Sequence, residues 1–263
     1  MLSLNMESKL VKSEIFTKCI SLIIPCRNEN GTIGTAIELG FRLPGVNEVL
    51  VIEGNSTDET YQTAINAIQN LDAGLKNKVQ VYRQSGSGKW DAVLLGIDLS
   101  KNEHISIWDA DMTVSYAEQS LIHERFLSNL QHLGASCLST GNRMALREPG
   151  SMRFLNFMGN YFFSKLWSIL FRRYIPDLLC GSKVFSKKIL SNLPPKLIAK
   201  DPFGDFAIIA AAMVSGQNLE FQNLSYRARS YGQTNILRWS GGLKLLKFTA
   251  AFLNYRISYK STK

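Results

Sequence analysis

Histidine and cysteine are scarce in this chain, and their spacing does not suit a zinc site. Its three histidines and four cysteines are spread over 263 residues, with no C-x-x-C pair and no histidine at ligand spacing from a cysteine. Structural zinc sites need closely spaced ligands, so the sequence predicts none. The cysteines are interpreted as reduced, mostly structural thiols of a cytosolic protein. They are Cys19, Cys26, Cys137 and Cys180.

Repeats, low-complexity tracts and long linkers are also missing. Residues 1–18 are polar and contain no apolar core, so no secretory signal is expected. A composition of 45% hydrophobic and 19% charged residues suits one large globular domain, with or without an appendage. The one convincing break, at 147–150, divides the chain into residues 1–148 and 149–263, although we expect the sheet to continue past it.

Negative charge is in short supply. Thirty Lys and Arg against 21 Asp and Glu give a net charge of +9. This balance suits a phosphorylated ligand, an anionic lipid surface or a nucleic acid, and it is also compatible with a soluble protein that has a basic surface. We expect no nucleic acid partner, because no strand carries the repeated aromatic and basic residues of such a binding face.

The first half of the chain alternates short apolar runs with segments of helical period. The runs 20–25, 48–52, 79–82 and 104–108 are predicted strands. The segments between them, 32–42, 58–70 and 89–99, have apolar residues three or four apart and are predicted helices. This alternation is typical of a parallel sheet covered by helices, in which ligands bind beyond the carboxyl ends of the strands.

Asp109-Ala110-Asp111, directly after the fourth strand, is the most informative pattern. Two carboxylates one residue apart can hold a divalent metal against a diphosphate, because Mg²⁺ and Mn²⁺ prefer oxygen ligands and bind one or two carboxylates together with substrate phosphates. A nucleotide-sugar is the natural substrate of such a site. The alternative is a solvated pair of acids in a surface turn.

Polar segments also follow the three earlier strands, at 25–31, 53–58 and 84–89. Each has a structural alternative, since asparagines suit turns, Ser56 or Thr57 suits a helix N-cap and the paired glycines suit a hinge. The candidate ligand-binding residues in these segments are Pro25, Arg27, Asn28, Glu29, Glu53, Asn55, Ser56 and Lys89.

The glycine segment 84–89 fits neither of two common nucleotide motifs. A Walker loop needs Ser or Thr after its lysine and glycine five residues before it, but Trp90 follows Lys89 and Gln84 precedes it at that distance. A dinucleotide fingerprint needs a third glycine, which is absent at that spacing. Phosphate binding by the loop backbone, with Lys89 as a point charge, stays open.

Taken in order, the four strand ends resemble the glycosyltransferase family 2 enzymes, whose nucleotide-sugar-binding half has the GT-A fold. Residues 25–29 resemble the family's P-x-x-N-E opening, 53–58 its acidic segment, 86–89 its G-x-G-K loop and 109–111 its metal motif. The chain departs from the family after Glu53, where a second acid is usual, so base recognition would rest on Glu53 alone.

The resemblance implies a mixed, mostly parallel α/β sheet flanked by helices and a metal-dependent, inverting hexosyltransferase. Residues 1–148 would bind a UDP- or GDP-linked sugar and residues 149–263 the acceptor, with Mg²⁺ or Mn²⁺ on Asp109 and Asp111. Asp111 is thereby also a predicted catalytic residue. The donor-binding set would be Pro25, Arg27, Asn28, Glu29, Glu53, Asn55, Ser56, Lys89, Asp109, Ala110 and Asp111.

Residues 179–185, 201–206 and 226–235 resemble a branch that includes the polyprenyl-phosphate sugar synthases and bacterial enzymes of surface-glycan assembly. The likeness implies a lipid-linked phosphate or saccharide acceptor. An acid at the position of Asp205 is the branch's candidate for the catalytic base, with Asp201 as runner-up.

The acceptor decides how much a base matters. A hydroxyl needs a carboxylate base, whereas a phosphate is already ionised, so Asp205 is essential only for a hydroxyl acceptor. Arginine forks bind phosphate oxygens well, although Arg227 and Arg229 would equally protect a strand edge. The predicted acceptor- or phosphate-binding residues are Lys183, Asp201, Arg227 and Arg229.

Two segments bear on a membrane: 154–171 is apolar and rich in aromatic residues with arginines at both ends, and 237–256 is basic and amphipathic. The first is short for a span, which needs about 20 apolar residues, and it contains a lysine, so we expect it to lie on a membrane. The alternative is that both segments pack against each other or a partner subunit. We therefore expect a cytoplasmic protein on the inner face of the cell membrane and leave a homo-oligomer open.

A catalytically silent GT-A protein that assists a membrane glycan pathway is the other interpretation. Such a protein would tolerate loss of Asp109 or Asp205, and the sequence retains both.

Overall fold

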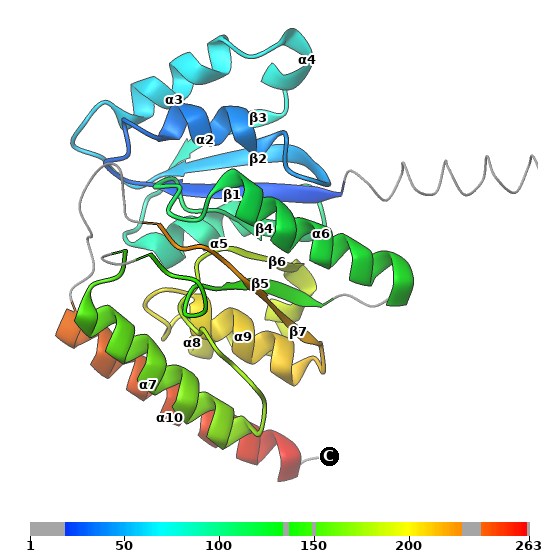
Figure 1. Ribbon diagram of the computed structural model, residues 1–263, viewed down its shortest axis with the longest axis vertical. Helices are drawn as coiled ribbons and strands as arrows, with labels where there is room; N and C mark the ends of the chain where they lie inside the picture. Colours follow the sequence, from blue (N-terminus) through cyan, green and yellow to red (C-terminus); the bar gives the residue numbers. More distant parts are fainter. Residues whose placement is uncertain (1–18, 134–136, 149–150, 228–237, 262–263) are drawn as a thin grey trace, which may run out of the picture.

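A seven-stranded sheet forms the centre of the protein (Figure 1). The computed structural model describes residues 19–133, 137–148, 151–227 and 238–261. The strand order is β3-β2-β1-β4-β6-β5-β7, and only β6 runs antiparallel to its neighbours. The strands are β1 (Ile20–Cys26), β2 (Val46–Glu53), β3 (Val79–Arg83), β4 (His104–Ile107), β5 (Leu138–Asn142), β6 (Lys183–Ser186) and β7 (Leu219–Asn223).

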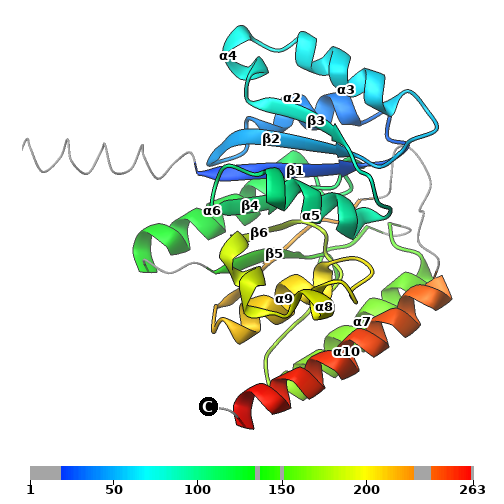
Figure 2. The ribbon, with the colours of Figure 1, turned by 180° about the vertical axis from the view of Figure 1, so that it is seen from behind.

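Helices cover both faces of this sheet (Figures 1 and 2). The predicted mixed, mostly parallel sheet flanked by helices is thereby confirmed, and the first four predicted strands match β1 to β4 to within two residues. The helices are α2 (Ile33–Gly40), α3 (Thr60–Gln69), α4 (Ala73–Lys76), α5 (Lys89–Leu99), α6 (Tyr116–Leu133), α7 (Phe154–Phe171), the 3₁₀ helix η1 (Lys187–Asn192), α8 (Pro195–Ile198), α9 (Asp205–Val214) and α10 (Arg238–Ser261).

The sheet separates two apolar cores. Side chains alternate along β1, so Leu22 and Ile24 belong to the core on the side of α2, α3 and α6, whereas Ile23 belongs to the core that includes residues of α5, α7, α9 and α10. Burial on both faces explains why the strands are nearly continuous apolar runs rather than alternating ones.

An aromatic cluster joins α7 and α10 to α9. Trp167 is fully buried against Phe206 and stacks on Phe252, and its indole N–H donates to Oγ1 of Thr249 over 3.0 Å. One face of α7 is therefore ordinary core, as the alternative for this segment predicted. Within the described residues, no helix is long and apolar enough to cross a membrane.

His123 on α6 is fully buried between β4 and the segment before β2. Its ring nitrogens lie 2.8 Å from Oγ of Ser106 and 2.8 Å from the carbonyl oxygen of Pro44. Burial lowers the pKa of His123 to about 4, although the Pro44 carbonyl opposes the shift. The imidazole is therefore neutral in the folded protein at pH 7.

This buried histidine predicts a loss of stability in mild acid. At pH values between the unfolded-state pKa of about 6.5 and the folded-state pKa of about 4, only the unfolded state gains a proton. The free energy of unfolding therefore decreases as the pH is lowered, by at most about 3 kcal/mol. Chemical denaturation from pH 7 to 4 measures the slope. His123→Gln is expected to flatten it and exposed His132→Gln to leave it unchanged; equal slopes in all three proteins would refute the prediction.

Candidate active site

The first two loops at the carboxyl edge of the sheet are bound to each other. The amide of Asn28 donates to Oγ of Ser56 over 3.0 Å, and Oδ1 of Asn28 accepts the amide of Thr57 at 2.8 Å. Asn28 and Asn55 both have φ of +57°, a conformation that asparagine tolerates better than most residues. Asn28 and Asn55 therefore shape the turns. Their contact with a bound ligand stays a prediction.

Glu29 and Glu53, the two acids of these loops that are predicted ligand contacts, are both buried. The amide of Glu29 donates to Oγ1 of Thr60 over 2.8 Å, and Glu53 accepts the amide of Ser56 at 2.5 Å. Glu53 also lies 3.7 Å from the guanidinium of Arg83. Of the other predicted donor contacts, Pro25 is half-buried at the end of β1 and Arg27 is exposed beyond it.

Asp109 and Asp111 follow β4 in a tight turn. Trp108 and Ala110 are buried beneath it, and Met112 continues it at φ +50°. Oδ1 of Asp111 accepts both the amide and the hydroxyl of Thr113, at 3.1 and 2.9 Å, so this carboxylate is fixed before any ligand arrives. Strained backbone of this kind is retained where the surroundings demand it, often at functional sites.

Lys89, the first residue of α5, contacts Asp109. Its ammonium lies 2.5 Å from one carboxylate oxygen and 2.8 Å from the other. Burial lowers the pKa of Lys89, but the charges of Asp109, Asp205 and Asp111 outweigh it and hold the pKa above the ordinary value. Gly88 before it has φ +89°, which turns the loop so that α5 starts within reach of Asp109.

Gly181 packs directly against this ion pair. A Cβ there would collide with the carboxylate of Asp109 and the ammonium of Lys89. We expect Gly181→Ala to separate the pair and to reduce roughly a hundredfold the rate of any reaction that these two groups serve, because catalytic groups must be held to within about an ångström. Steady-state kinetics test this against Gly159→Ala, a position with open space around it. A Gly181→Ala rate within twofold of the parent would contradict it.

β6 brings a second ion pair to the same edge. Its antiparallel register sets Lys183 opposite Ile107, and the ammonium of Lys183 lies 2.6 Å from Oδ1 of Asp205 while donating to the carbonyl of Cys180. Lys183 is fully buried and Asp205 is 7% exposed. This geometry favours a positioning role for Lys183 over the predicted phosphate contact, because its ammonium is enclosed by protein groups.

Asp201 is placed differently from Asp205. Its two oxygens accept the amides of Phe203 and Ala207, at 2.9 and 2.7 Å, so it caps the start of α9. Burial raises the pKa of Asp201 to about 6 and the charge of Asp205 adds to the shift, while the amide hydrogen bonds oppose it. Asp201 thus orients the helix that carries Asp205, which makes Asp205 the better candidate for a base.

Arg227 meets this cluster only through its backbone, since its amide donates over 3.2 Å to the carbonyl of Thr113, the residue that binds Asp111. Arg227 is exposed, with Nε 3.9 Å from Glu148, and Arg229 lies outside the described residues.

Arg143 after β5, which was not predicted from the sequence, forms a two-point ion pair of 2.8 and 2.9 Å with fully buried Asp177. Only the mixed sheet brings these residues, 34 apart, together at the carboxyl edge.

The carboxylates present fit a divalent metal only together with a ligand. No group of three or more His, Cys, Asp or Glu side chains within the described ranges could hold a metal by itself. Asp109 and Asp111 supply the one or two carboxylates that Mg²⁺ uses when substrate phosphates complete its shell.

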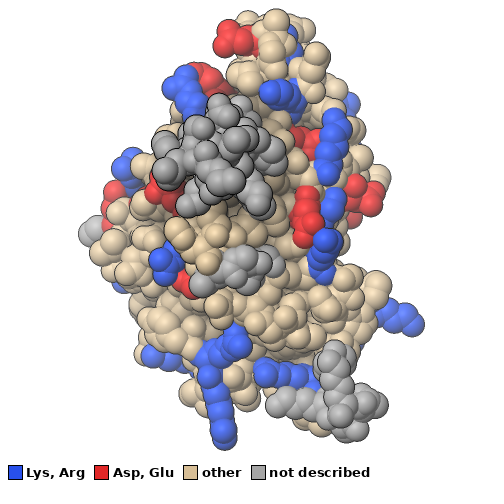
Figure 3. Space-filling view, turned by 90° about the vertical axis from the view of Figure 1, so that its right-hand side faces the viewer, with Lys and Arg blue, Asp and Glu red and all other residues tan. Residues whose placement is uncertain are grey.

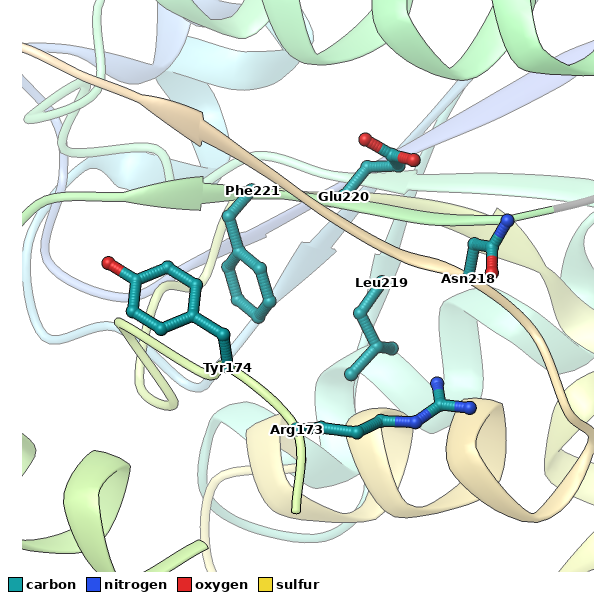
Figure 4. Close-up of a pocket in the computed structure, with 6 residues that line it drawn as sticks. All are labelled: Arg173, Tyr174, Asn218, Leu219, Glu220 and Phe221. Carbon is teal, nitrogen blue, oxygen red and sulfur yellow. The ribbon is translucent and has the colours of Figure 1, made fainter. Parts of the chain in front are cut away.

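A surface hollow lies elsewhere (Figure 4). It is bordered by Arg173, Tyr174 and the first residues of edge strand β7, which β6 and β5 separate from β4. None of the predicted site residues lines it.

A mixed, mostly parallel sheet with a carboxylate pair, a lysine and a buried Asp–Lys pair at its carboxyl edge defines a protein of the GT-A type. The chain belongs to glycosyl transferase family 2, whose family model matches residues 21–187. The polyprenyl-phosphate branch within the family is not established by this match.

Comparison with known proteins agrees with this assignment. Glycosyltransferase AglJ of Haloferax volcanii is 28% identical over 186 residues, which cover 70% of this chain and 55% of that protein. The chain thus spans about half the length of this relative.

Solved structures of glucosyl-3-phosphoglycerate synthase from Mycobacterium tuberculosis share the fold. The complex with Mn²⁺, UDP and phosphoglyceric acid superposes with a TM-score of 0.66 at 16% identity, over 89% of this chain and 78% of that one. The complex with Mn²⁺ and UDP-glucose gives 0.65 at 16% identity, over 89% and 79%.

Proposed function

We propose that the protein is a metal-dependent, inverting hexosyltransferase that moves a sugar from a UDP- or GDP-linked donor to a lipid-linked phosphate or saccharide. The observation that carries this proposal is the meeting of Asp109, Asp111, Lys89 and the Asp205–Lys183 pair at one edge of the sheet. Complexes of the similar synthase with Mn²⁺ or Mg²⁺ and UDP support a nucleotide-sugar donor.

Each group has a distinct task in this proposal. Asp109 and Asp111 would hold Mg²⁺ or Mn²⁺, which when bound neutralises charge on the leaving diphosphate. Lys89 adds a positive charge at the same place, and Glu53 with the loops of Asn28 and Ser56 encloses the nucleotide.

Transfer forms a bond from the acceptor oxygen to the anomeric carbon as the bond to the diphosphate breaks. If the acceptor is a hydroxyl, Asp205 takes its proton, and Lys183 holds that carboxylate in place. If it is a phosphate, no proton needs to leave, and Asp205 serves only to orient the acceptor.

An enzyme that uses a lipid-linked acceptor must reach that acceptor at a membrane. We propose that the protein is cytoplasmic and attached peripherally to the inner face of the cell membrane. A role in glycan or cell-envelope synthesis is proposed from the resemblance to the polyprenyl-phosphate branch. A homo-oligomer stays a proposal.

A panel of UDP-, GDP- and dTDP-sugars tests the function. Purified protein is incubated with each donor in Mn²⁺ or EDTA, with and without polyprenyl phosphate, and released nucleotide is quantified. Turnover of one donor that EDTA abolishes and the lipid stimulates is expected. Absence of turnover together with absence of metal-dependent nucleotide binding would favour the silent assembly protein.

A further inference from the structure

The outer face of α7 is apolar and open to solvent. Seven of its large hydrophobic side chains are 40–75% exposed, although the opposite face of the same helix packs in the core. At 100° per residue they fall along one side of the helix. They are Phe154, Leu155, Met158, Tyr161, Phe162, Ile169 and Leu170, named here the α7 stripe.

α10 lies beside α7 and extends this surface. Leu243, Leu246 and Ile257 are 56%, 43% and 68% exposed, while Phe248 and Phe252 of the same helix are buried against Trp167. Figures 1 and 2 show the two helices together at one end of the molecule, opposite α3 and α4. An apolar surface of this extent on a folded protein marks a place where something binds.

The charged side chains of the two helices have a single sign. Neither α7 nor α10 contains Asp or Glu, and residues 149–263 hold seventeen Lys and Arg against four acids. Three of those acids, Asp177, Asp201 and Asp205, are buried. The end of the molecule formed by α7 and α10 accordingly shows Lys and Arg without Asp or Glu on the face in Figure 3.

Lys165 lies within the stripe in a manner that suits an interface. Its ammonium is 5.6 Å from the ring centre of Tyr161, a cation–π contact with another exposed residue of the stripe. Arg172 and Arg173 at the end of α7 and Lys244 and Lys247 on α10 are exposed. Cations at the border of an apolar surface match the phosphates that border the hydrocarbon of a bilayer.

We infer that the α7 stripe and the exposed side of α10 bind the surface of an anionic lipid bilayer, with both helices lying in the plane of the headgroups. A second copy of the chain is the poorer occupant, because a twofold contact would set these cations against one another without a carboxylate on either helix. The described helices are also too polar to cross the bilayer.

This surface is connected to the active site. Asn160, buried on α7, donates to Oδ1 of Asp177 over 2.8 Å, and Asp177 binds Arg143 at the carboxyl edge. On α10, Gly241 packs against Phe203, two residues before Asp205. Docking through α7 and α10 therefore brings the edge that carries Asp205 toward the headgroups. The membrane surface itself is inferred without the proposed function, and only the identity of a lipid-linked acceptor rests on it.

Vesicle sedimentation tests the surface without donor, metal or turnover. The full-length protein is mixed with vesicles of phosphatidylcholine alone or with phosphatidylglycerol added. The variant Phe162→Ser/Ile169→Ser removes two exposed members of the stripe, Lys244→Gln/Lys247→Gln removes charge, and Leu121→Ser changes an exposed leucine on α6 as the control. Circular dichroism and thermal melting check that each variant is folded.

We expect the parent protein to bind the anionic vesicles. The binding should fall at least about tenfold in each double variant and should not fall in Leu121→Ser. Salt should weaken it and neutral vesicles should bind less. Protein that stays in the supernatant, or a folded Phe162→Ser/Ile169→Ser variant that binds as the parent does, would overturn the inference. A dimer that this variant dissociates, without lipid binding, would assign the surface to a second copy. Because no sugar is transferred in this assay, its result is independent of the proposed enzyme activity.

Discussion

Asp111→Asn is expected to lower kcat/KM of the sugar transfer roughly a thousandfold while the protein stays folded. The carboxamide retains an oxygen that can accept the hydrogen bonds of the Thr113 amide and hydroxyl, so the turn after β4 keeps its shape. It loses the negative charge that a divalent cation requires. Initial rates with the donor found in the panel, at several Mn²⁺ concentrations, give the effect.

Asp98→Asn is the matched control, since Asp98 is exposed near the far end of α5 and its loss should leave the rate unchanged. Calorimetric titration adds a second readout, in which the Asp111→Asn protein should bind nucleotide equally with Mn²⁺ and with EDTA. A variant that keeps a Mn²⁺-dependent affinity and most of its activity would show that this carboxylate does not hold the metal.

Lys183→Met is expected to lower the free energy of unfolding by about 3 to 5 kcal/mol. Methionine fills much of the same volume, but it leaves the carboxylate of Asp205 and the carbonyl of Cys180 without the buried ammonium that binds both. An uncompensated charge in a low-dielectric interior carries a large desolvation penalty. Urea denaturation at pH 7 measures the difference.

The double variant Lys183→Met/Asp205→Leu distinguishes charge from packing. Removal of both partners should recover much of the stability lost in Lys183→Met, because no buried charge is then left unpaired. Lys188→Met, five residues along the chain and exposed in a surface ion pair with Glu103, should cost less than about 1 kcal/mol. Equal losses in Lys183→Met and the double variant would mean that the shape of the side chain matters and its charge does not.

Helices α7 and α10 show where the sequence left two alternatives. The pattern over 154–171 was compatible with a helix on a membrane and with one packed in the core. The structure gives α7 both kinds of face, since Trp167 and Phe163 enter the aromatic cluster while Phe162 and Ile169 are exposed. A helix that is apolar all round does not reveal from periodicity which side the core will cover.

Local patterns in the sequence are enough to predict the sheet and to propose the edge at which its chemistry takes place. Apolar runs followed by polar turns predict parallel strands with a common carboxyl edge, and a carboxylate pair after a strand is a local pattern that needs no partner to be recognised. The pairing of Lys89 and Lys183 with their carboxylates is visible only in the three-dimensional structure. Lys89 and Asp109 are 20 residues apart, and Lys183 and Asp205 are 22 apart. The second pairing depends on the register of an antiparallel β6 inside a mostly parallel sheet, which no local pattern encodes. Lys183, which suits a phosphate in the sequence, is therefore buried against a carboxylate in the fold.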